Sequence, residues 1–462
     1  MFATVLMGIA LLQADSITRA DLAASYLRFE QAMEAKPPGE SSLRSISQAF
    51  DSATIAFFTG RNATAIEAID SQTRLLTGTP LDEADLWRFK VRVKPSIVQS
   101  DKPFIVTTSI LRMYGETSSR LIEVKLRHTR MVKEISLGAI QTGIPGFASL
   151  SIESITLPEG QYEVTVSSGG FSMTAGHVFA CKELPSTANA RFEREIEALP
   201  EGADSLLVDA VKSRIELLKD EPSEGNSAEF LANPIKLMES IEKQIESLKQ
   251  GKDPFAEGQG DFWIRLRGST AFPVRIYVPN TKATKLPVVI ALHGMGGDEN
   301  MFLEAYGAGL IRRLAIPKGY LLVSPRTEAF SGSQENVRAL LTFLEKAFVI
   351  DKERIFLVGH SMGAGAAITV ASRTPELFAG VVAIAGVRSF SPDQSFPPVM
   401  FVAGELDAIA SPAQMRRVFD SAKAAGAATE FKVYEGLGHT MVVAATLPTA
   451  LDWLLTRKPS GG

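Results

Sequence analysis

The stretch Ile355–Gly365 reads IFLVGHSMGAG, and the interpretation of the C-terminal part of the chain starts from it. Its first four residues form an apolar run typical of a buried parallel strand, and its last residues are small, as in a closely packed helix. Ser361 stands between the two, with a glycine two positions away on each side. Such glycines allow a strained turn and a close approach of helix and strand, so the Ser361 hydroxyl is predicted to lie exposed at the carboxyl end of a sheet.

The pattern G-x-S-x-G is weak evidence when it stands alone. Glycine makes up about 7% of residues in proteins, so the pattern is expected by chance in roughly one chain in seven of this length. The strand-like run before Ser361 and the helix-like run after it make chance a poorer explanation. A catalytic role for the Ser361 hydroxyl therefore depends on finding the other groups of such a site at suitable places along the chain.

Residues 259–462 are predicted to form one α/β domain. Short apolar runs alternate here with helical patterns, which is the order expected for a mostly parallel sheet covered by helices on both faces. The first two runs, 262–267 and 273–278, read as a hairpin of edge strands. The predicted buried strands are 286–292, 320–323, 355–358, 378–384, 399–402 and 430–433.

A glycine-rich loop, HGMGGD at residues 293–298, directly follows the first of these buried strands. Glycines leave the backbone N–H groups of such a loop free to face a reaction site. The N–H groups of Met295 and Met362 are therefore predicted to bind a developing oxyanion. A phosphate-binding loop is the rival interpretation, but the Gly-Lys-Ser/Thr ending of that motif is missing.

An acid and a histidine follow Ser361 in the chain order Ser, Asp, His. Asp407 comes at the end of the next-to-last strand, where a carboxylate can orient a histidine and stabilise its protonated form. Glu405, nearer the strand, and Asp393, in the preceding connection, are weaker candidates for this role. His439 follows the last strand in the sequence Gly-Leu-Gly-His, whose glycines leave the loop free to place the imidazole over the sheet edge.

Through the motifs HGMGG, GHSMG, GELD and GLGH, residues 262–457 resemble an α/β-hydrolase. The most similar types are the carboxylesterase/phospholipase group, feruloyl-esterase-like and polyhydroxybutyrate-depolymerase-like enzymes, and the catalytic domain of prolyl oligopeptidase. The resemblance implies Ser361 as nucleophile, His439 as general base and then acid, and Asp407 as its orienting partner. It places His293 and His360 in the structural framework. The connection 386–398 is short, so the helical lid of many lipases is not expected here.

The function implied by this resemblance is the hydrolysis of carboxylic esters through an acyl-enzyme, without a metal ion or cofactor. The substrate would be a small-molecule or polymer-linked ester. One alternative is a serine peptidase of the prolyl-oligopeptidase type, although no four-stranded repeat precedes residue 258. Another is a catalytically inactive binding or scaffold protein, against which the complete set Ser361, Asp407 and His439 argues.

The chain before residue 259 is predicted to form accessory segments that supply no catalytic group. Residues 15–84 show apolar residues at helical spacing, interrupted by proline and glycine. Residues 85–182 alternate with a period of two, which predicts a β-sandwich, and the phrase LPEGQY at 157–162 loosely resembles a late hairpin of immunoglobulin-like modules. Residues 183–258 return to helical patterns and form a linking segment.

Composition and charge exclude some classes of partner. The chain has 462 residues and 48 basic against 52 acidic side chains, and it shows no basic stripe, so a nucleic-acid partner is not expected. The lone Cys181 cannot form an intrachain disulfide and is expected to be a small buried side chain. His128 and His177 have no neighbours at metal-ligand spacing. The sequence gives no indication of the oligomeric state.

The N-terminal run 2–12 is apolar and is followed by Ala14, which makes residues 1–14 a candidate signal peptide. Export to the periplasm or the medium is therefore expected, with a cytoplasmic location as the alternative. The run is too short to cross a bilayer as a helix, which needs ~20 apolar residues. No integral membrane segment is expected.

Overall fold

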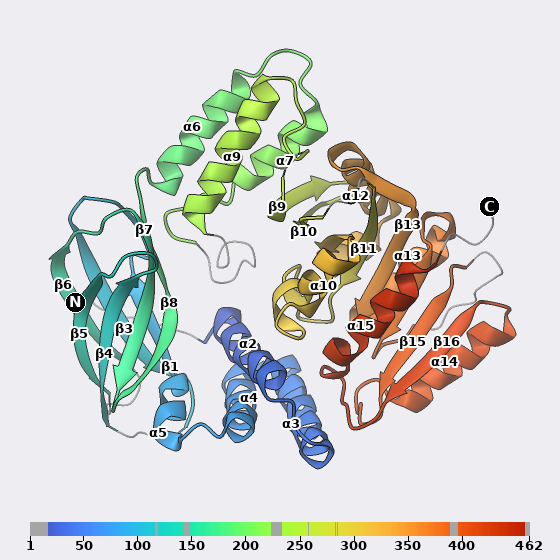
Figure 1. Ribbon diagram of the computed structural model, residues 1–462, viewed down its shortest axis with the longest axis horizontal. Helices are drawn as coiled ribbons and strands as arrows, with labels where there is room; N and C mark the ends of the chain where they lie inside the picture. The colour runs from blue at the N-terminus through green and yellow to red at the C-terminus, as the bar shows by residue number, and fades with distance from the viewer. Residues whose placement is uncertain are drawn as a thin grey trace, which may run out of the picture. The chain divides into compact units, whose positions relative to one another are not determined.

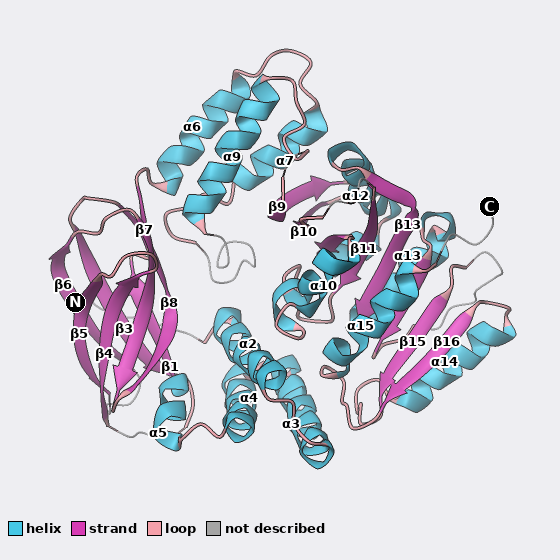
Figure 2. Cartoon of the chain, in the orientation of Figure 1, coloured by secondary structure: helices cyan, strands magenta, loops and turns pink. Residues whose placement is uncertain are grey.

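The computed structural model describes residues 17–115, 119–142, 147–222, 233–256, 258–281, 283, 285–388 and 396–457. The chain divides into two compact units, each made of several segments; one comprises 1–29, 56–191 and 217–239, and the other 30–55, 192–216 and 240–462. The expected helical segments 15–84 and 183–258 are therefore each divided between the two units. The candidate signal peptide lies outside the described residues. Figures 1 and 2 show the elements by number and by type.

The first unit contains two β-sheets. One consists of three antiparallel strands, in the order β1 (Phe89–Lys94), β3 (Phe104–Arg112) and β6 (Phe147–Ile155). The other has five strands, in the order β2 (Ile97–Gln99), β8 (Phe171–Cys181), β7 (Gly160–Ser168), β4 (Arg120–His128) and β5 (Glu134–Thr142). Both sheets contribute side chains to one apolar core, for example Val106 and Val124. The two sheets account for the period-two pattern, and the immunoglobulin-like type stays a prediction.

The helices outside the α/β region follow the glycine and proline signals of the sequence. They are α2 (Arg19–Ala35), α3 (Glu40–Phe58), α4 (Asn62–Thr77), α5 (Leu81–Ala84), η1 (Asp85–Arg88), α6 (Pro185–Glu197), α7 (Ser205–Ile215) and α9 (Pro234–Lys249). Gly78 ends α4 with a φ of 73°, a left-handed conformation that glycine adopts without strain. Among the helices in the described part of the chain, none is long and apolar enough to cross a bilayer.

The second unit is built on a sheet of eight strands. Their order is β16 (Thr429–Tyr434), β15 (Val399–Gly404), β14 (Gly380–Ile384), β13 (Ile350–His360), β11 (Leu286–Leu292), β12 (Leu321–Pro325), β10 (Ala271–Val278) and β9 (Gly260–Arg267). The first six in this order are parallel, and β10 and β9 form an antiparallel hairpin at the edge. A mostly parallel sheet with an edge hairpin was the expected architecture.

Helices cover both faces of this sheet. Every residue of β11, β12, β14 and β15 is buried, and successive side chains of a strand point to opposite faces, so both faces must be covered. The helices are α10 (Leu310–Lys318), α11 (Thr327–Gly332), α12 (Gln334–Ala347), α13 (Met362–Arg373), α14 (Pro412–Ala424) and α15 (Val442–Leu455), with the short turns η2 (Met301–Ala305) and η3 (Pro375–Leu377).

The order of the strands creates a switch point between β11 and β13. The chain passes from β11 to β12 on one side and then returns to β13 on the other side of β11. Connections that leave in opposite directions open a crevice at the carboxyl ends of such strands, where ligands bind in open α/β sheets. Leu292 pairs with Gly359, so the loop 293–298 and the turn at Ser361 begin side by side.

Candidate active site

Ser361 occupies a strained turn between β13 and α13. Its φ of 56° and ψ of −119° are unusual for a residue with a side chain, and such strain persists only where the surrounding structure enforces it. The Ser361 N–H donates a hydrogen bond of 2.9 Å to the carbonyl of Ile384, the last residue of β14. The turn is therefore held against the neighbouring strand while the side chain projects from its apex.

The glycines around Ser361 are required because no side chain would fit there. A Cβ atom on Gly359 would lie 2.1 Å from the carbonyl oxygen of Gly363, and one on Gly363 would lie 2.0 Å from that of Leu292. A Cβ atom on Gly386, after β14, would lie 2.1 Å from the carbonyl oxygen of Ser361 itself. The predicted steric role of the two motif glycines thus has a direct geometric cause.

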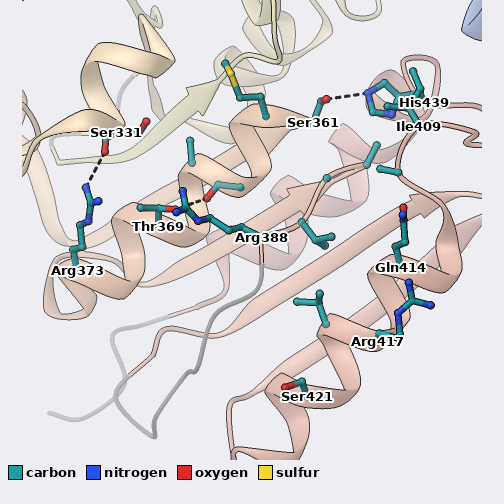
Figure 3. Close-up of a pocket in the computed structure, with 18 of the residues that line it drawn as sticks. Ser331, Ser361, Thr369, Arg373, Arg388, Ile409, Gln414, Arg417, Ser421 and His439 are labelled. Atoms are coloured by element: carbon teal, nitrogen blue, oxygen red, sulfur yellow. Dashed lines mark hydrogen bonds between the residues drawn. The ribbon is translucent and has the colours of Figure 1, made fainter. Parts of the chain in front are cut away.

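Ser361, His439 and Asp407 are joined by hydrogen bonds. The Ser361 Oγ and His439 Nε2 atoms are 2.9 Å apart, as the dashed line in Figure 3 marks, and His439 Nδ1 is 2.9 Å from Asp407 Oδ2. His439 is 1% exposed and Asp407 3%. The second carboxylate oxygen of Asp407 accepts hydrogen bonds from the N–H groups of Ile409 and Ala410, at 2.8 and 2.7 Å. This arrangement fixes the imidazole with a proton on Nδ1 and leaves Nε2 free to accept one.

The two alternative acids are not in this chain of hydrogen bonds. The side chain of Glu405 is 38% exposed and forms an ion pair of 2.8 Å with Arg44. Its carboxylate also accepts a hydrogen bond from the N–H of Gly436. This bond, followed by the hydrogen bond from Arg44, holds the pKa of Glu405 below its ordinary value. Asp393 lies outside the described residues.

The two proposed oxyanion donors lie on the two elements that meet at the switch point. Met362 is the first residue of α13, where backbone N–H groups have no partner within the helix. Met295 lies in the glycine-rich loop with its side chain 55% exposed. The loop comes close to the turn, because a Cβ atom on the neighbouring Gly294 would lie only 3.2 Å from Ser361 Cβ.

His293 and His360 have structural partners. His293 Nδ1 donates to the carbonyl of Gly294, and Nε2 accepts from the N–H of Thr327 at 3.1 Å, which fixes the glycine-rich loop. His360 accepts a hydrogen bond of 2.6 Å from the Tyr306 hydroxyl at Nδ1 and donates from Nε2 to the carbonyl of His439 at 3.0 Å. Burial, followed by the nearby charge of His439, holds the pKa of His360 well below its ordinary value, so the ring stays neutral.

Sequence reasoning missed one residue at the site, Asp51 of α3. This carboxyl group is 5% exposed, and its Oδ1 atom accepts a hydrogen bond of 2.8 Å from the backbone N–H of His439. Burial raises the pKa of Asp51 to about 6. The only signal in the sequence was an acidic residue on the apolar face of this helix. Asp51 directly follows Phe50 and lies one turn beyond Ser47, and both of these residues are also buried.

A cavity of about 930 Å³ lies beside Ser361 and His439. Residues of α13, of α14 and of the segment after β14 line it, and Figure 3 shows Arg373, Arg388 and Arg417 on these elements. Within the described ranges, no cluster of three or more histidine, cysteine or acidic side chains has the geometry to hold a metal ion.

A family model described as "Putative esterase" matches residues 269–441, which include Ser361, Asp407 and His439. The "Probable acetylxylan esterase A" of Aspergillus fumigatus is 27% identical over 128 residues, which are 24% of this chain and 34% of that protein. The "Feruloyl esterase B" of Neurospora crassa is 26% identical over 138 residues, 26% of this chain and 46% of that protein. The matched part thus spans between a third and a half of the length of these relatives.

Solved structures align with a similar part of the chain. An S-formylglutathione hydrolase from Staphylococcus aureus aligns with 16% identity and a TM-score of 0.36, over 43% of this chain and 98% of that one. A ferulic acid esterase from Anaeromyces mucronatus aligns with 16% identity and a TM-score of 0.36, over 44% and 92%. The family match confirms that residues 269–441, in the C-terminal part of the chain, resemble esterases.

Proposed function

We propose that the chain is a serine-dependent hydrolase of carboxylic esters that works through an acyl-enzyme. The observation that carries this proposal is the hydrogen-bonded series of half-buried Ser361 with buried His439 and Asp407, which begins at a strained turn beside the switch point of the sheet. The esterase match over residues 269–441 supports it independently.

In the first half of the reaction, Ser361 Oγ attacks the carbonyl carbon of the ester while His439 Nε2 takes the hydroxyl proton. Asp407 stabilises the imidazolium that forms and keeps its orientation. The N–H groups of Met295 and Met362 stabilise the negative charge on the carbonyl oxygen. The intermediate then collapses, and the departing alkoxide takes the proton from His439, which leaves an acyl group on Ser361. Water repeats the cycle and releases the acid.

The substrate we propose is a small-molecule or polymer-linked ester. The names of the curated relatives, acetylxylan and feruloyl esterase, support an ester whose alcohol belongs to a saccharide. Residues 85–182, which we propose to be an immunoglobulin-like sandwich, would then be an accessory to the hydrolase rather than part of its chemistry. Export is proposed on the apolar run 2–12.

Replacing the nucleophile tests the proposal. Ser361→Ala is expected to lower ester turnover by about 10⁴ to 10⁶, because the covalent route is lost while binding groups remain. Covalent labelling by a fluorophosphonate should disappear in the same variant, and its unfolding transition should match that of the wild type. Labelling that persists in Ser361→Ala would show that another residue is the nucleophile and would contradict the proposal.

A further inference from the structure

The backbone of His439 is held on both sides by buried side chains. Its N–H donates to Asp51 Oδ1 at 2.8 Å, and its carbonyl accepts from His360 Nε2 at 3.0 Å. His360 belongs to the nucleophile turn, whereas Asp51 comes from α3, 388 positions earlier in the sequence. Because both backbone groups are fixed, the direction in which the imidazole leaves the chain is fixed as well.

Helix α3 contacts the histidine loop at several other points. Arg44 binds Glu405 through two hydrogen bonds of 3.2 and 2.8 Å, and Glu405 in turn accepts from the N–H of Gly436. The Ser47 hydroxyl donates to the sulfur of Met441 at 3.4 Å. Farther along α3, the hydroxyl of Thr54 lies 3.3 Å from that of Thr440. The helix therefore contacts the loop both before and after His439.

Gly438, the residue before His439, provides an independent sign of this contact. A Cβ atom on Gly438 would lie 2.6 and 2.7 Å from the two carboxylate oxygens of Asp51. The glycine was expected to give the loop freedom, but its φ is not positive, and the space beside it is occupied by Asp51. A side chain at position 438 would have to displace the Asp51 carboxylate, so glycine lets the loop pass close to it.

On these contacts, and resting on the esterase function proposed above, we propose that Asp51 is a positioning residue for His439. Helix α3 is accordingly a working part of the hydrolase rather than a separate accessory. The carboxylate fixes the backbone from which the imidazole reaches Ser361, and its negative charge favours the imidazolium formed when Ser361 attacks. The groups that act electrostatically on Asp51 are the carboxylate of Asp407 and the imidazole of His439.

The pH dependence of the reaction should report this role. Burial and then the neighbouring Asp407 raise the pKa of Asp51, against the opposing hydrogen bonds from the N–H groups of His439 and Ala408. Protonation weakens the carboxyl group as an acceptor for the His439 N–H. Protonation also adds an O–H group, which has no acceptor if the proton is on Oδ2, because that atom is buried without a hydrogen-bond partner among the described residues. Turnover is therefore expected to fall as the pH falls through about 6.

Two substitutions at Asp51 separate its charge from its hydrogen bond. Asp51→Ala removes both and is expected to lower kcat by about 10- to 100-fold with little change in KM. Asp51→Asn keeps an acceptor for the His439 N–H but has no charge to titrate. Its kcat should therefore lie between those of Asp51→Ala and the wild type, and the acid limb of its pH profile should differ from that of the wild type. Glu40→Gln, which removes an exposed carboxylate from the same helix, is the matched control.

The rate of fluorophosphonate labelling per folded molecule is the second measurement, since it reports the reactivity of Ser361 without any ester. If Asp51→Ala labels and turns over like the wild type, or if both Asp51 variants leave the pH profile unchanged, the positioning role is wrong. Slow labelling of folded Asp51→Ala supports the positioning role even if the wild type hydrolyses no ester. Inactivity of the wild type on every ester would count only against the proposed esterase function.

A different observation concerns the substrate of the proposed esterase. Among the described residues that line the cavity beside Ser361, the permanently charged ones are Arg373, Arg388 and Arg417, and none is a carboxylate, phenylalanine, tyrosine or tryptophan. Arg373 donates to the carbonyl of Ser331, whereas Arg388 and Arg417 have no hydrogen-bond or ion-pair partner among the described residues. The net charge of the chain is −4, so this excess of positive charge is a property of the cavity.

We infer that the cavity selects esters that carry a negative charge on the acyl or the alcohol side. Guanidinium groups bind carboxylates and phosphates through paired hydrogen bonds, which are stronger than neutral ones. The described lining contains no phenylalanine, tyrosine or tryptophan, so its arginine side chains are the groups we expect to select the substrate. A carboxylate and a phosphate share this chemistry, and the experiment distinguishes them.

The test compares 4-nitrophenyl hexanoate with the mono-4-nitrophenyl ester of adipic acid, and glyceryl acetate with the acetate of glycerol phosphate. The anionic member of at least one pair should have the higher kcat/KM, and added salt should reduce that preference. Arg388→Gln or Arg417→Gln should reduce this preference by about tenfold, with kcat/KM for the anionic ester falling much more than that for the neutral ester. Arg338→Gln, on α12 outside the cavity, is the control. Hydrolysis of neutral esters with no anionic preference in either pair, or a preference unchanged in both variants, would contradict this inference and leave the esterase proposal intact.

Discussion

Ser361 and Asp407 each owe their position to one backbone feature. The positive φ of Ser361 costs about 1–3 kcal/mol, which the pairing with β14 and the tight glycine contacts must offset. Asp407 is held by two backbone N–H groups, so its carboxylate cannot rotate away from His439. The sequence could indicate both positions, because Ser361 directly follows β13 and Asp407 lies three residues after the end of β15.

The roles of the two acidic residues after β15 can be separated by amide substitutions. Asp407→Asn is expected to lower kcat by about 10⁴, because an amide favours the wrong tautomer of His439. Glu405→Gln should lower it by less than about tenfold, since Glu405 lies outside the hydrogen-bonded series and contacts Arg44 instead. Steady-state kinetics of the two variants on one ester checks this, and the reverse order of effects would mean that Glu405 is the acid.

The role of Asp51 could not be predicted, because an acidic residue on the apolar face of a helix does not indicate its partner, which is the backbone of a residue 388 positions away. Its pKa nevertheless makes a prediction about stability. Folding raises that pKa from 3.8 to about 6, so the stabilising contribution of the protonated form is complete below about pH 4 and is lost as the pH rises through 6. Asp51→Asn has no carboxyl group to titrate, so its stability does not decrease at this position as the pH rises.

The unfolding free energy of Asp51→Asn relative to the wild type should therefore increase by about 2–3 kcal/mol between pH 4 and pH 7. Urea denaturation of both proteins across this range measures the difference. A difference independent of pH would show that the carboxyl group of Asp51 has an ordinary pKa in the folded protein.

At the scale of elements, apolar runs identified the parallel strands but not their full extent. Strand β13 was expected from Ile355 and begins at Ile350, because the polar residues 351–354 continue the strand beyond the buried part of the sheet. Its pairing with β11 is irregular there, where the partner of Leu286 is Ile350 and that of Val288 is Ile355. A pattern based on hydrophobicity cannot detect strand residues that face water.

Alanine substitutions at two glycines of α13 are expected to change the unfolding free energy in opposite directions. Gly363→Ala should lower the unfolding free energy by at least about 2 kcal/mol, because the new Cβ atom would meet the carbonyl oxygens of Leu292 and His293 at 2.0 and 2.6 Å. Gly365→Ala should be neutral or raise it by about 0.5–1 kcal/mol, since its nearest neighbour is 3.6 Å away and alanine favours the helix. Urea denaturation of the pair is the measurement, and equal effects would mean that β11 and α13 are not closely packed.

For the whole molecule, the sequence indicated where secondary structure changes type but not which segments share a core. Changes in hydrophobic period separated the helical, β and α/β regions along the chain. Residues 30–55 nevertheless belong to the compact unit that contains the eight-stranded sheet, although their helical pattern resembles that of residues 62–77 in the other unit. Helical patterns show which face of a helix is buried and carry no information about the surface that covers it.

A fragment that starts near Gly258 tests this division of the chain. The fragment retains Ser361, Asp407, His439 and both proposed oxyanion donors, so on the sequence alone it should hydrolyse a small activated ester. Without α3, however, the His439 N–H loses Asp51, so fluorophosphonate labelling of the folded fragment should be at least about tenfold slower than that of the full chain. A peptide of residues 38–55 added in trans should restore part of the rate, and the same peptide carrying Asp51→Ala should restore less. Labelling of the fragment alone at the rate of the full chain would show that α3 is dispensable and that the hydrolase begins near residue 259, as its sequence indicated.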